Sequence, residues 1–149
     1  TSRPGLIIGR SGEGVTKLKA DIVDFMKNIK ADTKTDIKLE IEEVKSPEAS
    51  AAIVAQMIAE GLEKRMPFRR VMKSMVEKVM ACRDVQGVRI FLSGRLGGAE
   101  MARCEDLKKG RIPLQTFRAN IDFKRYEAHL PYGKIGIKVW IYTGEVFTK

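Results

Sequence analysis

The stretch Leu6-Ile7-Ile8-Gly9-Arg10-Ser11-Gly12 decides how the beginning of this chain folds. Its two glycines bracket a short polar turn, and an amphipathic run over residues 15–29 follows. Because glycine has no Cβ, a sugar-phosphate backbone can come close to the main-chain N–H groups of such a turn. Gly9, Arg10, Ser11 and Gly12 are therefore candidate RNA-binding residues, and the turn offers contact rather than chemistry.

The segments after the turn supply the context that makes it specific. Apolar residues recur every three or four positions over residues 15–29, which predicts a helix with one buried face. Apolar and charged residues alternate over residues 37–42, which predicts a half-buried strand. A G-x-x-G turn followed by a helix and a strand is typical of the KH domain, whose turn clamps a nucleic-acid backbone. This order favours a KH domain over a glycine turn that only caps a helix.

Residues 45–48, Lys-Ser-Pro-Glu, predict a boundary and the start of a new helix. That helix should run over residues 48–65, and a second helix over residues 68–82 should follow a proline break. We therefore divide the chain into a domain of residues 1–46 and a domain of residues 47–149.

The second of these helices carries a cluster of cations. Arg69, Arg70 and Lys73 fall on one side of it, and only Glu77 offers a nearby counter-charge on the same helix. A solvated helix face is the common explanation of such a cluster. Because the arginine fork donates two hydrogen bonds to a phosphate at once, we favour nucleic-acid binding by these three residues.

Alternating apolar and polar residues predict strands over residues 88–92, 117–123 and 135–142. A short fourth strand is expected around residues 111–113. Two helices followed by consecutive strands indicate an α+β fold, with the helices on one face of a mainly antiparallel sheet.

A glycine-rich loop over residues 93–100 follows the first of these strands. Such a loop can track a nucleic-acid backbone closely, with Arg95 and Arg103 available for phosphates. A flexible strand connection fits the same composition equally well.

The charge of the chain points to a polyanionic partner. The chain holds 28 Lys and Arg against 19 Asp and Glu, and residues 87–149 hold 12 against 6. Neutralising phosphates releases condensed counterions, so a surface of this charge favours nucleic acid.

The sequence offers no catalytic constellation. His129 is the only histidine, and Cys82 and Cys104 lack the spacing of a metal site or a disulfide scaffold. We expect a protein that is not an enzyme and that has no cofactor, metal or small-molecule substrate. No apolar run is long enough to span a membrane, and no signal-peptide pattern is present, so a cytoplasmic location is expected.

With these segments placed, nearly the whole chain resembles the universal KH-containing family of the third protein of the small ribosomal subunit, in its bacterial form. The matching stretches are Arg3-Pro4-Gly5-Leu6-Ile7-Ile8-Gly9, Phe68-Arg69-Arg70, residues 93–100, Arg118-Ala119-Asn120-Ile121-Asp122 and Gly136-Ile137-Lys138-Val139-Trp140-Ile141. The resemblance implies a type II KH domain followed by a family-specific α+β domain. The family has a helix and strands before the segment that begins here at Thr1, so we expect an N-terminally truncated chain.

The resemblance also implies a function. The family is a structural constituent of the small-subunit head that binds ribosomal RNA. In this family the region of Arg69, Arg70 and Lys73 lines the tunnel through which messenger RNA enters, and it helps hold and unwind the message. Residues 9–12 and the loop around Arg95 match segments that face ribosomal RNA, and neighbouring head proteins are implied partners. A free KH-domain regulator of RNA and a nucleic-acid repair lyase remain as alternatives.

Overall fold

The computed structural model describes residues 4–29 and 37–147, so Arg3 of the first matching stretch lies outside the described residues. The chain divides into two compact units, Thr1–Lys45 and Ser46–Lys149. Within the described residues, no helix combines the length and the apolar character needed to cross a membrane.

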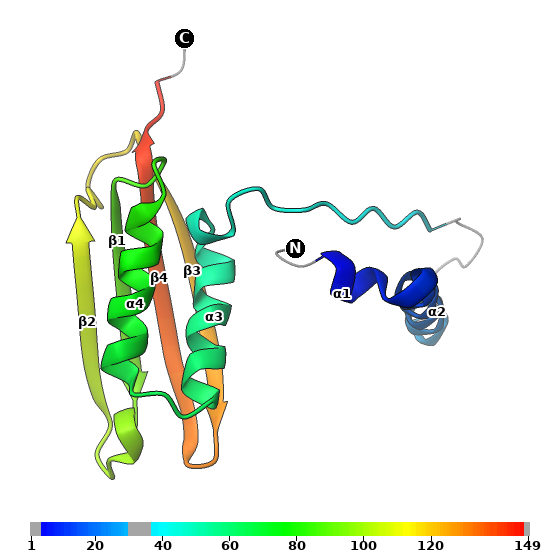
Figure 1. Ribbon diagram of the computed structural model, residues 1–149, viewed down its shortest axis with the longest axis horizontal. Coiled ribbons are helices and arrows are strands. Elements are labelled where there is room, and N and C mark those ends of the chain that lie inside the picture. The colour runs from blue at the N-terminus through cyan, green and yellow to red at the C-terminus, as the bar shows by residue number, and fades with distance from the viewer. Residues whose placement is uncertain (1–3, 30–36, 148–149) are drawn as a thin grey trace. The chain divides into compact units, whose positions relative to one another are not determined.

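The first unit is built around a junction of two helices (Figure 1). Helix α1 (Pro4–Ile8) and the short 3-10 helix η1 (Arg10–Gly12) lead into the long helix α2 (Glu13–Asn28). A Cβ on Gly14 would overlap the carbonyl oxygen of Ile7, so only glycine allows the end of α1 to pack this closely on the start of α2. The predicted helix is confirmed, and the glycine at its second position, Gly14, sets its contact with α1.

Two sequence-based expectations for this unit are wrong. Helix α2 has no buried side chain, and Phe25, on its apolar side, is 65% exposed. Residues 37–44 form no strand. A strand needs a neighbour to pair its N–H and C=O groups, and the described residues of this unit contain no other strand.

The second unit is a two-layer α+β fold, in which two helices cover one face of a four-stranded antiparallel sheet (Figure 1). The short helix η2 (Pro47–Ala49) precedes helices α3 (Ala51–Glu63) and α4 (Phe68–Ala81). The sheet has the order β2-β1-β4-β3. Its strands are β1 (Gly87–Gly94), β2 (Arg103–Gly110), β3 (Ala119–Leu130) and β4 (Gly133–Glu145).

The hydrophobic core lies between the helices and the sheet. The two central strands, β1 and β4, point alternate residues toward the helices, and these residues are fully or almost fully buried. They meet apolar side chains of α3 and α4 in one cluster, whose largest members include Ile58, Val71, Ile90, Ile137 and Ile141. Burial of this apolar surface is what holds the layers together.

The fourth strand is not where the sequence predicted it. Residues 111–113 belong to a connection, whereas β2 occupies Arg103–Gly110 at the edge of the sheet. The sequence of β2, Arg-Cys-Glu-Asp-Leu-Lys-Lys-Gly, shows no run of apolar alternation because an edge strand buries little.

Helix α3 is capped from the sheet rather than from its own sequence. Oδ2 of Asp122 on β3 accepts a hydrogen bond from the backbone N–H of Ala51 at 2.7 Å. The side chain of Ser50, at the usual capping position, makes no such bond. The Asp122 carboxylate therefore satisfies one free N–H of the first turn and carries the charge that a helix N-terminus favours.

We expect Asp122→Ala to lower the free energy of unfolding by about 1 kcal/mol, the usual cost of losing a helix cap. Asp122→Asn keeps an acceptor oxygen and should lose less. Urea unfolding of both variants measures the difference, and equal losses would show that the capping oxygen is not the cause.

Candidate nucleic-acid interface

The G-x-x-G turn of the first unit has the geometry of a tight, glycine-dependent corner. Gly9 and Gly12 have φ values of +70° and +81°, in the region that favours glycine. The N–H of Gly9 donates to the carbonyl oxygen of Gly5 at 3.0 Å, and the N–H of Glu13 donates to that of Arg10. Arg10 and Ser11 are exposed at the tip. The turn presents main chain and one cation to solvent.

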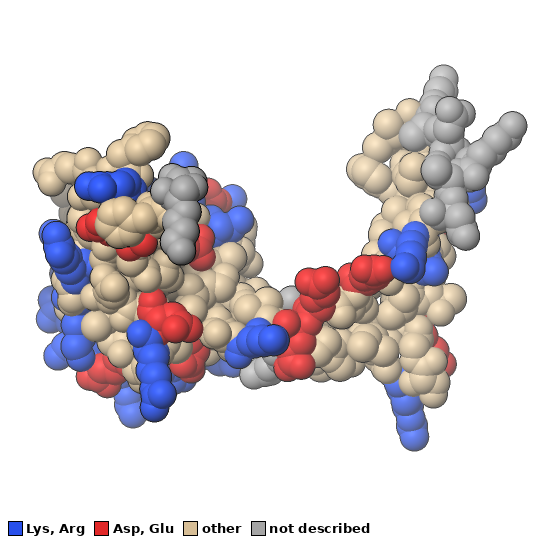
Figure 2. Space-filling view, turned by 90° about the horizontal axis from the view of Figure 1, so that it is seen from above, with Lys and Arg blue, Asp and Glu red and all other residues tan. Residues whose placement is uncertain are grey.

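The cations of α4 come together as predicted. Arg69, Arg70 and Lys73 line an open depression of about 500 Å³, together with Pro67, Ser74 and Glu77. Within residues 4–29 and 37–147, Arg70 and Lys73 form no ion pair. On the face of the second unit that Figure 2 shows at the left, Lys and Arg side chains are interspersed with Asp and Glu. The depression therefore offers two cations, Arg70 and Lys73, that form no ion pair among the described residues, beside one acidic residue of its lining, Glu77.

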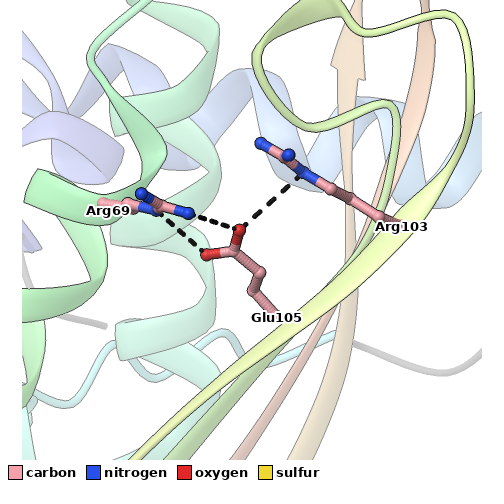
Figure 3. Close-up of polar contacts among 3 residues, drawn as sticks. All are labelled: Arg69, Arg103 and Glu105. Atoms are coloured by element: carbon pink, nitrogen blue, oxygen red, sulfur yellow. Dashed lines mark hydrogen bonds and ion pairs between the residues drawn. The ribbon is translucent and has the colours of Figure 1, made fainter.

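Arg69 is different, because it has a counter-charge that the sequence did not reveal (Figure 3). Its Nε and Nη2 donate to Oε2 and Oε1 of Glu105 on β2, at 3.3 and 3.1 Å. Nε of Arg103, two residues before Glu105, lies 3.7 Å from the same Oε1. The hydrogen bond from Arg69 lowers the pKa of Glu105 and raises that of Arg69, so both groups stay charged. Glu77 is the only acidic residue near the cluster on the helix itself, and Glu105 adds a counter-charge from the sheet.

The guanidinium groups of these two arginines lie over the aromatic ring of Phe68. The guanidinium carbons of Arg69 and Arg103 each lie 5.6 Å from the centre of its ring. A cation over an aromatic face is attracted by the ring quadrupole. Phe68 and Glu105 thus bring Arg69 of α4 and Arg103 of β2 into one group, although the sequence placed these arginines in separate segments.

The loop over residues 93–100 is an ordered structure rather than a flexible connection. Leu96 is only 1% exposed and joins the core cluster. Arg95 donates from Nε to the carbonyl oxygen of Ala99 at 2.9 Å and from Nη1 to that of Tyr132 at 3.2 Å. The first bond closes the loop on itself and the second ties it to the turn between β3 and β4. Contact of Arg95 with RNA stays a prediction.

The described residues contain no group of His, Cys, Asp and Glu side chains arranged to hold a metal ion. Burial and a hydrogen bond to Glu48 raise the pKa of the Cys82 thiol. A raised pKa makes a thiol less nucleophilic at neutral pH.

Comparison with known families decides which group of proteins this arrangement belongs to. Residues 58–141 match the family described as ribosomal protein S3, C-terminal domain, and residues 1–49 match the KH domain. The chain belongs to the ribosomal protein S3 family. The expected order, a KH domain followed by helices and an antiparallel sheet, is confirmed.

Individual members of the S3 family match over nearly all of this chain. It is 48% identical over 146 residues to small ribosomal subunit protein uS3 of Pseudomonas aeruginosa (strain UCBPP-PA14), covering 98% of this chain and 60% of that protein. Protein uS3c of Guillardia theta is 46% identical over 145 residues, covering 97% and 64%. The chain thus spans about three-fifths of the length of these relatives. Their names are those of ribosomal proteins, not of enzymes.

Proposed function

We propose that this chain is a structural component of the small ribosomal subunit, where it binds ribosomal RNA and helps form the tunnel through which messenger RNA enters. Membership of the S3 family supports the subunit, and the cation-lined depression on α4 supports the contact with message. Arg70 and Lys73 carry the proposal furthest because they are exposed and form no ion pair within the described residues.

The proposed mechanism is electrostatic. Cations on a rigid helix hold the phosphates of the RNA backbone. Because contacts to phosphates do not distinguish one base from another, a message of any sequence can pass. Translocation supplies the work of unwinding, while the depression keeps one strand from re-pairing. The G-x-x-G turn and the loop around Arg95, which project main-chain groups from ordered elements, are assigned to ribosomal RNA.

Neighbouring proteins of the subunit head are the proposed partners of the apolar surface. Leu114, Phe117, Val146 and Phe147 are all exposed in the second unit. Exposed large apolar side chains of this kind favour contacts with another protein. The proposed location is the cytoplasmic ribosome.

Co-sedimentation tests the assignment to the subunit. We expect a tagged form of this chain, expressed in bacterial cells, to migrate with small subunits in a sucrose gradient. A photoreactive nucleotide placed in the message at the mouth of the tunnel should then crosslink to α4. If the chain instead stays in the free-protein fractions while it binds RNA, it is a free KH-domain regulator and the proposal fails.

A further inference from the structure

The Glu105 carboxylate occupies the edge of Arg69 that is best suited to a phosphate (Figure 3). Its two oxygens face the Nε and Nη2 of the guanidinium, at 3.3 and 3.1 Å. Carboxylates and phosphates bind this planar fork in the same bidentate way. A phosphate that takes this edge of Arg69 must therefore displace the carboxylate of Glu105.

We propose that Glu105 is an internal competitor for Arg69, which limits how tightly the α4 depression grips the phosphates of single-stranded RNA. This inference rests on the proposed function of the depression. In the free protein Arg70 and Lys73 are ready for phosphates, whereas Arg69 joins them only by exchanging one anion for another.

The fold keeps the competitor in place. Glu105 stands opposite the buried Leu92 in the β1–β2 ladder, so its side chain is on the face of the sheet that the helices cover. Its side chain is 26% exposed, against 70% for that of Arg69. A carboxylate fixed on a strand thus meets a guanidinium that solvent, and a ligand, can reach.

The exchange is energetically easy in both directions. Ion pairs between exposed side chains are individually weak, because water screens both charges. Phe68 and Arg103 keep the surroundings of Arg69 attractive for an anion after the exchange: the ring orients the guanidinium, and Arg103 adds a second cation. A grip that is limited in this way holds a message without preventing it from moving.

Glu105→Gln tests the competition, because it removes the charge and keeps the side-chain size. The measurement is binding of a fluorescent oligouridine to the 149-residue chain over a range of salt concentrations. We expect binding to tighten about three- to tenfold at low salt and the slope of log K against log salt to steepen by about 0.7, the value for one more phosphate contact on a single strand. In the Arg69→Ala background the same substitution should have no such effect.

Asp106→Asn is the matched control. Asp106 is the next residue of β2, forms ion pairs with Arg89 and Lys108, and pairs with Phe91 on the opposite face of the sheet. The Asp106→Asn substitution removes the same charge without changing the contacts of Arg69, so it should leave the slope of log K against log salt unchanged. Glu105→Thr, which suits a strand, serves as a second variant if the glutamine variant fails to fold.

Three results would overturn the competition. If the Glu105→Gln substitution tightens binding in the Arg69→Ala background as well, the cause is a general effect of charge. If Glu105→Gln weakens binding, Glu105 positions Arg69 instead of competing for it. An unchanged affinity would show that there is no competition. If Arg70→Ala and Lys73→Ala still weaken binding in any of these cases, only the inference about Glu105 fails. If those two variants also bind normally, the proposed role of the depression fails as well.

Discussion

Replacing Arg69, Arg70 and Lys73 together by alanine is expected to weaken binding of single-stranded RNA roughly ten- to a hundredfold at physiological salt. Each phosphate contact adds about 0.7 to the slope of log K against log salt on a single strand. Because Glu105 already occupies Arg69, the variant loses the contacts of Arg70 and Lys73, and the slope should flatten by about 1.4. The loss should be similar for oligomers of different sequence, because phosphate contacts carry no base information. Fluorescence anisotropy over a salt series measures both quantities.

The control for this triple variant removes the same charge elsewhere. Arg83, Arg111 and Lys124 are exposed cations outside the depression, and their joint replacement by alanine also removes two arginines and a lysine. If binding depends only on net charge, both triple variants lose affinity equally. A clear difference in slope between them locates the phosphates at α4, whereas equal losses would refute the assignment.

Leu96→Ala is expected to lower the free energy of unfolding by about 3 kcal/mol, within the range of roughly 2–5 kcal/mol found for leucine replaced in a core. Leu96 is 1% exposed and anchors the loop over residues 93–100 in the core cluster. Removing its side chain leaves a cavity where the loop meets the layer of helices and sheet. Urea unfolding followed by circular dichroism measures the loss.

Leu114→Ala makes the same chemical change at a site that is 55% exposed. Its free energy of unfolding should stay within about 0.5 kcal/mol of the original value, as is usual for surface substitutions. If the two leucine variants unfold alike, Leu96 does not hold the loop and the account of this loop as a built element is wrong.

The elements that the sequence predicted well are those whose patterns are local. The helical spacing of apolar residues found α2 and α4, the start signal at residues 45–48 found α3, and strict alternation found the buried strands β1 and β4. The prediction of a strand over residues 37–42 was wrong. Alternation indicates only a preference for the strand conformation, whereas a strand also requires a neighbouring strand to pair with. Strand β2 was missed for the opposite reason: its partner β1 imposes the strand on a sequence with little apolar alternation.

The sequence predicted which cations form the candidate site, but not which residues these cations contact. Helical spacing alone places Arg69, Arg70 and Lys73 on one face. The pairing of Arg69 with Glu105 joins residues 36 positions apart, and it depends on the register of a strand that local patterns did not identify. Phe68 looked like an ordinary apolar position at the start of a helix, and only the fold shows that two guanidiniums converge on its ring.

The order of the strands in the sheet has a consequence for folding during synthesis. Strand β4 lies between β1 and β3 but follows both in the chain, so the layers cannot close while β4 is still being synthesised. Helix α4 and the β1–β2 hairpin, which carry Phe68, Arg69, Arg103 and Glu105, precede β4 in the chain and are therefore synthesised before it. A nascent chain thus exposes a basic, half-assembled surface to surrounding RNA before its core exists, and it completes folding only when β4 inserts at the centre of the sheet.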